Sequence, residues 1–294
     1  MSSSASQNSW RRERDDRGVW TLWFDQPGRA YNVLDRAAID QLDEHLADAE
    51  DDPSIAGFII RGGKPGGFCA GADLKSVLAC RTIAEIEGLL RRGLAVLNRL
   101  SSVRIPTVAL IHGVCLGGGL ELAMACRRRV ALASTVALQV GLPEVHLGLV
   151  PAWGGITGLP RLIEPDDALD LLLSGRSIGF LRARSLGIVD RLAAEGDPAE
   201  SLETLASAGH PERVPSEESW LLALDRARAQ ILDQPGEHPD VQERILSIVE
   251  KDLAQGPEAA RQAAIEAFAE LAMSEPSRES IKSFFQRGRG PSGH

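Results

Sequence analysis

The sequence lacks three features that would each point to a large functional class. It has no excess of basic residues, because 32 lysines and arginines stand against 41 acids and the net charge is −9. This balance gives no support for binding to nucleic acid or to an anionic membrane surface. It also has no apolar run of the roughly 18 residues that a membrane-spanning helix needs. We therefore expect no nucleic-acid partner and no membrane span.

The third missing feature is a set of residues with metal-ligand or disulfide spacing. None of the four cysteines belongs to a C-x-x-C pair, and the six histidines show no ligand spacing. The cysteines are Cys69, Cys80, Cys115 and Cys126. They are typical of neutral thiols in a reducing compartment, which predicts a cytoplasmic protein without a metal site. We expect His112 and His146 to be structural.

The N-terminus is rich in serine and then in arginine and aspartate, and it lacks the apolar middle of a secretory signal. Residues 1–15 are predicted to be a disordered tail. The 294 residues, 44% of them hydrophobic, suffice for one large α/β domain with an appendage.

Strand and helix patterns alternate along the first two thirds of the chain. β-branched and apolar runs predict strands at residues 18–25, 55–61, 105–111, 130–134 and 137–139. Helices are predicted from the N-cap Asp35 to about residue 50, and at residues 82–100 and 166–174. This alternation indicates βαβ units and a largely parallel sheet.

The most informative stretch covers residues 105–161. A buried strand there leads into three glycines, residues 117–119, and then into a run of helix formers that contains Glu121. The glycines therefore lie at a helix N-terminus, where unpaired N–H groups and the positive end of the helix dipole are available to a ligand. A second acid, Glu144, lies further along in another glycine- and proline-containing segment.

These residues alone leave several interpretations open. Glu121 fits a first-turn acid that only complements the helix dipole. Glu144 fits an ordinary surface acid. The glycines fit a phosphate-binding turn, although they match neither G-x-G-x-x-G nor G-x-x-x-x-G-K-[ST].

Three motifs, taken together, favour one interpretation. They are I-P-T-V-A-L-I-H-G-V-C-L-G-G-G-L-E-L-A, then G-L-P-E-V-H-L-G-L-V-P-A-W-G-G, and upstream G-F-C-A-G-A-D-L-K. In order and spacing they resemble the enoyl-CoA hydratase (crotonase) family, whose upstream motif is F-[CS]-A-G-A-D-[IL]-K. The segment at residues 181–190 is similar to the family's A-x-x-x-G-[IL]-V-D. The resemblance implies an α/β fold of the crotonase type, a ββα spiral, with a C-terminal helical extension.

The C-terminal part resembles a narrower group. E-A-F-A-E-L-A-M at residues 266–273 and the pair Phe284–Phe285 are similar to the end of the hydratase half of the multifunctional fatty-acid oxidation enzyme, the alpha subunit of the trifunctional complex. In that enzyme a dehydrogenase half follows, but this sequence contains no G-x-G-x-x-G between a strand and a helix. We expect a stand-alone hydratase that cannot reduce NAD. The expected division is a tail (1–15), a crotonase core (16–195), a linker with a helix (196–238), a C-terminal helical region (239–287) and a tail (288–294).

The resemblance also implies roles for individual residues. The backbone N–H groups of Ala72 and Gly118 would form an oxyanion hole for the thioester oxygen. Glu144 would donate a proton to C2, and Glu121 would hold and activate the water that adds to C3. The apolar surroundings are expected to raise the pKa of at least one of these carboxyl groups. The implied reaction is reversible syn hydration of trans-2-enoyl-CoA to 3-hydroxyacyl-CoA in fatty-acid β-oxidation.

Further residues are implied in binding the substrate, whose coenzyme A portion makes a separate cofactor unnecessary. They are Arg29, Ala30, Ala70, Gly71, Asp73, Lys75, Gly117 and Trp153. Backbone groups near Ala30 and Ala70 would hold coenzyme A, and Arg29 and Lys75 are candidates for its phosphates, with ordinary surface charge as the alternative. Trp153 stands where relatives carry a small residue or Phe, so it either narrows the acyl pocket or packs at its rim.

Two alternative functions accompany the hydratase. One is isomerisation of 3-enoyl to 2-enoyl thioesters, which needs one mobile carboxylate and the same oxyanion hole. The other is a non-catalytic acyl-CoA-binding subunit. The presence of both glutamates favours a hydratase over a thioester hydrolase, a dehalogenase or a decarboxylase. The expected partners are an acyl-CoA substrate, further copies of the chain in a trimer or hexamer, and a separate 3-hydroxyacyl-CoA dehydrogenase.

Overall fold

A six-stranded sheet forms the frame of the computed structural model, which describes residues 8–134, 136–193 and 215–287. Its strands, in spatial order, are β1 (Trp10–Arg14), β2 (Val19–Phe24), β3 (Gly57–Gly62), β5 (Thr107–Ile111), β7 (Arg128–Leu132) and β9 (Arg191–Ala193). Every neighbouring pair is parallel except the hairpin of β1 and β2. The prediction of a largely parallel sheet is confirmed.

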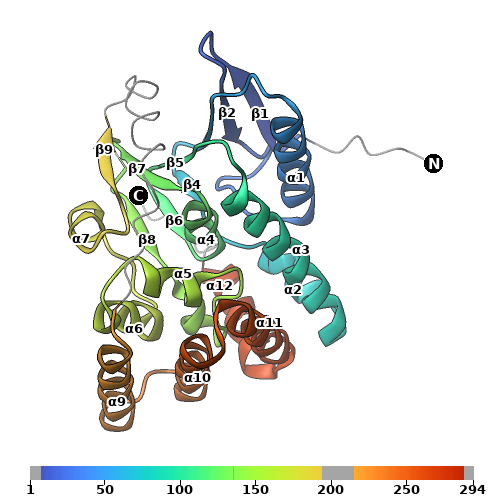
Figure 1. The fold of residues 1–294 in the computed structure, drawn as a ribbon. Helices are drawn as coiled ribbons and strands as arrows, with labels where there is room; N and C mark the ends of the chain where they lie inside the picture. The colour runs from blue at the N-terminus through green and yellow to red at the C-terminus, as the bar shows by residue number, and fades with distance from the viewer. Residues whose placement is uncertain (1–7, 135, 194–214, 288–294) are drawn as a thin grey trace.

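A second, smaller sheet lies beside the first and consists of β4 (Gly67–Cys69), β6 (Val114–Leu116) and β8 (Gln139–Gly141). Each of its strands directly follows a strand of the large sheet, so β3 is followed by β4, β5 by β6 and β7 by β8. Helices follow β4 and β6 before the next turn begins (Figure 1). The chain therefore forms the ββα spiral that the motifs predicted.

Strand β1 corrects the prediction of a disordered tail over residues 1–15. Residues 10–14 pair with β2, and the Trp10 ring is buried against Phe24 with ring centroids 4.2 Å apart. The Trp10 Nε1 group also donates a hydrogen bond of 2.8 Å to the carbonyl of Ala38. The charged residues that suggested disorder are exposed on an edge strand, a position where charge is common. Residues 1–7 lie outside the described part of the chain.

Three helices make up the central part of the helical layer. They are α1 (Arg36–Asp51), α3 (Ile83–Ser102) and α4 (Gly118–Ala125). The carboxylate of Asp35 caps α1 by accepting from Ala38 N at 2.9 Å, which confirms the predicted N-cap. The hydroxyl of Thr82 caps α3 in the same way through Glu85 N, at 3.2 Å. Helices α1 and α3 pack against each other on one side of the sheet.

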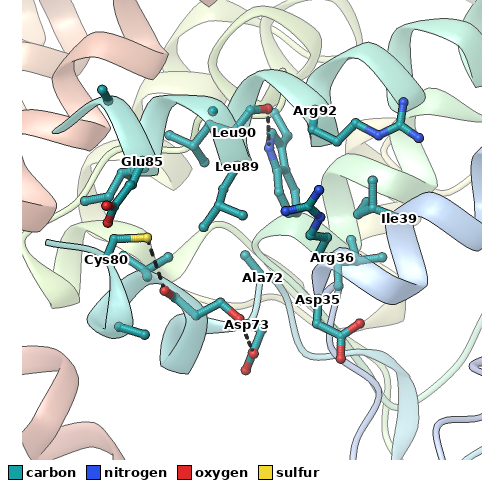
Figure 2. Close-up of a pocket in the computed structure, with 18 residues that line it drawn as sticks. Asp35, Arg36, Ile39, Ala72, Asp73, Cys80, Glu85, Leu89, Leu90 and Arg92 are labelled. Carbon is teal, nitrogen blue, oxygen red and sulfur yellow. Dashed lines mark hydrogen bonds between the residues drawn. The ribbon is translucent and has the colours of Figure 1, made fainter. Parts of the chain in front are cut away.

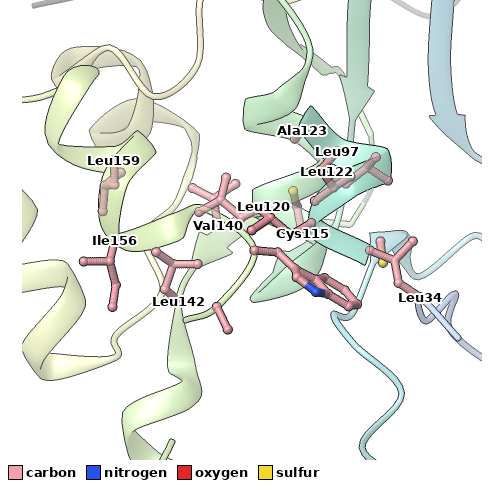
Figure 3. Packing of buried hydrophobic residues seen from close by; sticks show 14 of the residues in the cluster. Leu34, Leu97, Cys115, Leu120, Leu122, Ala123, Val140, Leu142, Ile156 and Leu159 are labelled. Atoms are coloured by element: carbon pink, nitrogen blue, oxygen red, sulfur yellow. The ribbon is translucent and has the colours of Figure 1, made fainter. Parts of the chain in front are cut away.

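Shorter helices connect the remaining parts of the core. They are α2 (Leu74–Ala79), η1 (Pro143–Leu147), α5 (Gly155–Gly158), η2 (Leu159–Arg161), α6 (Pro165–Ser174) and α7 (Phe180–Leu186). Buried side chains from α4, β8 and α5 meet between these elements, as Figure 3 shows for Leu120, Leu122, Val140, Leu142 and Ile156. The first turn of α4, which begins at the glycine turn, is therefore enclosed in the hydrophobic core. Within the described ranges no helix is long and apolar enough to cross a membrane.

The C-terminal helices fold back on the core of their own chain. They are α9 (Glu217–Asp233), α10 (Pro239–Gln255), α11 (Pro257–Met273) and α12 (Glu275–Arg287). Figure 1 places α9, α10 and α11 at the end of the molecule opposite the β1–β2 hairpin. Helix α11 packs against α3 and α10. The predicted linker at residues 196–238 contains α9, and its part at residues 196–214 lies outside the described residues.

Helix α12 contacts two other short helices. The hydroxyl of Ser277, which is buried, donates to the carbonyl of Gly148 at the end of η1, at 2.8 Å. The guanidinium of Arg278 donates to the carbonyl of Leu78 in α2, at 2.6 Å. One helix thus connects η1, which carries Glu144, to α2, which directly follows Ala72 and Asp73.

Candidate active site

Glu121 lies in the first turn of α4 and is almost completely buried, with 4% of its surface exposed. Its Oε1 atom accepts two backbone hydrogen bonds, from Trp153 N at 2.8 Å and from Gly155 N at 2.7 Å. The pKa of Glu121 is raised to about 7, because burial raises it by more than these two N–H donors lower it. Gly155 permits the approach, because a Cβ atom there would lie 3.0 Å from Oε1.

Glu144 lies at the start of η1 and has a different environment. Its Oε2 atom is buried, and no group in the described ranges donates a hydrogen bond to it. Burial and, to a smaller degree, the negative charge of Glu121 together raise the pKa of Glu144 to about 8. The two carboxyl groups therefore titrate as a pair, and repulsion between their charges favours a state in which they hold one proton.

The turn at Gly117 brings the helix start against Glu144. A Cβ atom at this position would lie only 2.6 Å from Glu144 Oε1. Gly117 also has φ of 51°, in the left-handed region that favours glycine. Its N–H donates to the carbonyl of Gly141 in β8 at 2.9 Å, which fixes the turn to the small sheet.

Two backbone N–H groups, those of Ala72 and Gly118, lie near each other next to this turn. A Cβ atom at Gly118 would lie 3.1 Å from Ala72 N. Gly118 is the first residue of α4, so its N–H has no partner within the helix and lies at the positive end of the dipole. Leu34 pairs with Gly71 and Asp73 on either side, and Ala72 N is left out of that pairing. Neither N–H donates to an acceptor in the part of the chain that the structure describes.

A cavity of about 600 Å³ opens from this point between the start of α1, residues 72–80 and α3. Its size lies within the range of about 300–1,000 Å³ typical of ligand sites. In Figure 2, Leu89 and Leu90 of α3 lie across from Ala72, with Ile39 to one side. Ala72 and Trp153 both line the cavity, so it reaches one residue of the N–H pair and the indole that lies next to the other, Gly118.

The residues predicted to bind coenzyme A through backbone groups or charge lie at or near the protein surface. Ala30 and Ala70 are exposed. The Arg29 guanidinium lies 3.0 Å from Asp35 and 3.5 Å from Asp73, so two carboxylates share its charge. Lys75 is exposed, with its Nζ 5.7 Å from the centre of the Phe285 ring. Phosphate binding by Arg29 and Lys75 stays a prediction.

Trp153, whose position the sequence left open, lies deep in the site. It is 8% exposed, and its Nε1 donates to the carbonyl of Leu90 in α3 at 3.0 Å. Two residues that contact this region escaped the sequence analysis, Gly155 beside Glu121 and Gly93 beside the indole. A signal for Gly93 existed, because a glycine inside a predicted helix costs about 1 kcal/mol relative to alanine and suggests a packing reason.

The sequence matches the family model of enoyl-CoA hydratase/isomerase over residues 14–208. The chain belongs to this family. Curated relatives include the fatty acid oxidation complex subunit alpha of Shewanella putrefaciens and that of Shewanella baltica, each 33% identical over 291 residues. The matches cover 95% of this chain and 41% of each relative, so the chain spans about two fifths of their length.

Solved structures of enoyl-CoA hydratases share the fold of this family member. The enzyme from Rhodobacter sphaeroides superposes with a TM-score of 0.71 at 23% identity, covering 97% of this chain and 91% of that one. A putative enoyl-CoA hydratase from Mycobacterium avium paratuberculosis gives 0.66 at 23% identity, covering 95% and 96%. At this level of identity the similarity shows the fold alone.

Proposed function

We propose that the chain is an enoyl-CoA hydratase that adds water across the double bond of a trans-2-enoyl thioester to give the 3-hydroxyacyl thioester. One observation carries the proposal: two buried carboxyl groups with raised pKa values lie at the same glycine turn as two free N–H groups. The relatives named as fatty-acid oxidation subunits support fatty-acid β-oxidation as the setting.

The two N–H groups provide the electrostatic part of this mechanism. The thioester oxygen gains negative charge as water adds and an enolate forms. Ala72 N and Gly118 N would donate to that oxygen from fixed backbone positions. A single donor of this kind typically contributes about 2.7–4 kcal/mol to transition-state stabilisation.

The two carboxyl groups divide the acid and base roles. Two N–H groups stabilise charge on Glu121, whereas nothing in the described ranges donates to Glu144 Oε2. The proton held by the pair therefore resides on Glu144. Glu121 acts as the base that orients water and takes its proton as oxygen bonds to C3, and Glu144 protonates C2. Proton transfer from Glu121 back to Glu144 restores the starting state.

The test replaces each acid with its amide. Glu121→Gln and Glu144→Gln each keep the shape of the side chain but cannot exchange the proton. We expect each to lower hydration of crotonyl-CoA by at least about 100-fold, measured as loss of the enoyl thioester absorbance. Binding of a saturated acyl-CoA is expected to change no more than a few-fold. Near-normal turnover by Glu144→Gln contradicts the assignment.

Isomerisation of 3-enoyl to 2-enoyl thioesters is the second candidate. The observation that favours it is the unpartnered Oε2 of Glu144, which is free to move a proton between C2 and C4. This reaction needs no activated water, so Glu121→Gln would retain isomerase activity while losing hydratase activity. A non-catalytic acyl-CoA-binding subunit would bind the thioester and turn over neither substrate.

We also propose that copies of the chain associate into a trimer or hexamer. Leu181 and Leu232 are 83% and 84% exposed, and Leu221 and Leu222 are about half exposed on α9. Association would remove such side chains from water at roughly 25 cal/mol per Å² of apolar surface. Sedimentation of the purified protein tests this, and a monomer at all concentrations contradicts it.

A further inference from the structure

The indole of Trp153 is held between two glycines on different elements. A Cβ atom at Gly93 in α3 would lie 2.5 Å from Trp153 Cε2 and 2.6 Å from Cζ2 and Nε1. A Cβ atom at Gly118 would lie 2.9 Å from Trp153 Cε3 and Cζ3. Neither glycine has room for a side-chain methyl group, because ring atoms this close to a real Cβ would have to shift.

Polar contacts fix the same residue at both ends. The Trp153 Nε1 group donates to Leu90 O at 3.0 Å, and the Trp153 backbone N–H donates to Glu121 Oε1 at 2.8 Å. The ring therefore cannot rotate away without losing a buried hydrogen bond. It cannot translate without disturbing the carboxylate that is proposed to activate water.

This rigid ring borders the place where the reacting carbons would lie. Gly118 N is one of the two proposed donors to the thioester oxygen, and the six-membered part of the indole packs against Gly118. Carbons C2 and C3 follow the thioester carbonyl directly, so they lie beside the ring. Past this point the cavity continues along Ile39, Val77 and Leu89, which suits an extended apolar chain.

We propose that Trp153 makes the site selective for straight-chain enoyl thioesters and excludes acyl groups branched next to the thioester. This inference rests on the proposed function and specifies its substrate class. Gly93 is a positioning residue in this scheme. It touches no substrate, but its missing side chain leaves the space that the indole occupies.

The first experiment compares linear and branched substrates. We expect the wild-type protein to hydrate crotonyl-CoA and trans-2-octenoyl-CoA with a kcat/KM at least about tenfold above that for 2-methylcrotonyl-CoA, since one methyl group changes discrimination by roughly 10–200-fold. Trp153→Leu should lower this linear-to-branched ratio by about tenfold or more. Trp153→Phe, the conservative variant, should lower it less. A ratio near one in the wild-type protein, or an unchanged ratio in Trp153→Leu, overturns the inference.

Binding separates this inference from the proposed function. Butyryl-CoA and 2-methylbutyryl-CoA are saturated and cannot be hydrated, so they report binding alone. The wild-type protein should bind the linear butyryl-CoA at least about tenfold more tightly than the branched thioester. If hydration fails while this difference in Kd is present, the proposed reaction is wrong, but the selectivity imposed by Trp153 is supported. If hydration proceeds and both ligands bind equally, the selectivity assigned to Trp153 is wrong, but the proposed reaction is supported.

A double-substitution cycle tests Gly93. Gly93→Ala alone should push the indole toward Gly118 and Glu121 and lower kcat for crotonyl-CoA by about tenfold or more, with a smaller change in KM. In the Trp153→Leu background the same substitution should have little effect on kcat, because the ring it displaces is absent. Equal effects in the two backgrounds would show that Gly93 acts independently of Trp153.

Discussion

The Oε2 atom of Glu144 is buried without a hydrogen-bond donor in the described ranges, so its ionised form is costly. A structural acid at this position would be expected to have a partner. A group that must give up and regain a proton in each cycle benefits from a pKa near the working pH. Under the proposed function, Glu144 therefore lowers the stability of the folded protein in exchange for reactivity.

The raised pKa of Glu144 predicts how the free energy of unfolding varies with pH. The carboxyl of Glu144 has a pKa of about 8 when folded against an ordinary value of 4.5. Between these values the folded state binds more protons than the unfolded state, so its contribution to the free energy of unfolding falls as pH rises. Glu144→Gln removes this contribution.

We expect the Glu144→Gln variant to be more stable than wild type at pH 8, by on the order of 1–3 kcal/mol. The difference should shrink toward pH 5, where the wild-type carboxyl is protonated. Urea unfolding at four values of pH measures it. Parallel stability curves for the two proteins would contradict the raised pKa.

The carboxyl pair also predicts the pH dependence of activity. In the proposed mechanism the reacting state has one proton on the pair, with pKa values of about 7 for Glu121 and about 8 for Glu144. Hydration should rise as the first proton leaves and fall as the second leaves, giving a bell-shaped kcat/KM profile near neutral pH. A rate that stays flat from pH 5 to pH 9 would contradict this assignment.

At the scale of the element, α3 contains two glycines, Gly88 and Gly93. Helix propensity alone predicts the same gain in stability when either is replaced by alanine. A Cβ atom at Gly88 would meet no atom within 4 Å, whereas at Gly93 it would collide with the rigid indole. Gly88→Ala should raise stability by up to about 1 kcal/mol. Gly93→Ala should lower stability by about 1–3 kcal/mol despite the same gain in propensity. Thermal unfolding of both variants decides the point, and a stabilised Gly93→Ala protein would refute the packing argument.

The elements show which parts of the fold could be predicted from the sequence. The Asp35 cap, the helix beginning after Thr82 and the strand at β5 follow from local patterns, and all are present. Strand β1 was missed because its stability comes from Trp10 packing on Phe24 and from pairing with β2, which the charged composition of the strand does not reveal.

Some features of the candidate site could likewise be predicted from the sequence, whereas others could not. The glycine turn and its two acids could be identified because they lie in contiguous motifs. The fit of Gly93 to Trp153 could not, because it joins two elements that are distant in the sequence and come together only in the fold. The sharing of Arg29 between Asp35 and Asp73 depends on tertiary structure for the same reason.

At the scale of the whole molecule, the C-terminal helices are part of the folded core. Residues such as Ile245, Ile265 and Phe268 in α10 and α11 are buried, and α11 packs on α3. We expect the backbone amides of α10 and α11 to exchange hydrogen as slowly as those of β5 and β7. Exchange on the timescale of exposed loops would show that these helices are not held by the core.

The contacts of α12 have a consequence for how the site comes into being. The helix holds the end of η1 through Ser277 and the end of α2 through Arg278. Protein chains are synthesised from the N-terminus, and domains begin to fold as they emerge. Both η1 and α2 leave the ribosome long before the helix that contacts them. A growing chain can therefore form its sheets early, but the contacts that hold η1 and α2 to one helix are added only when residues 275–287 have emerged.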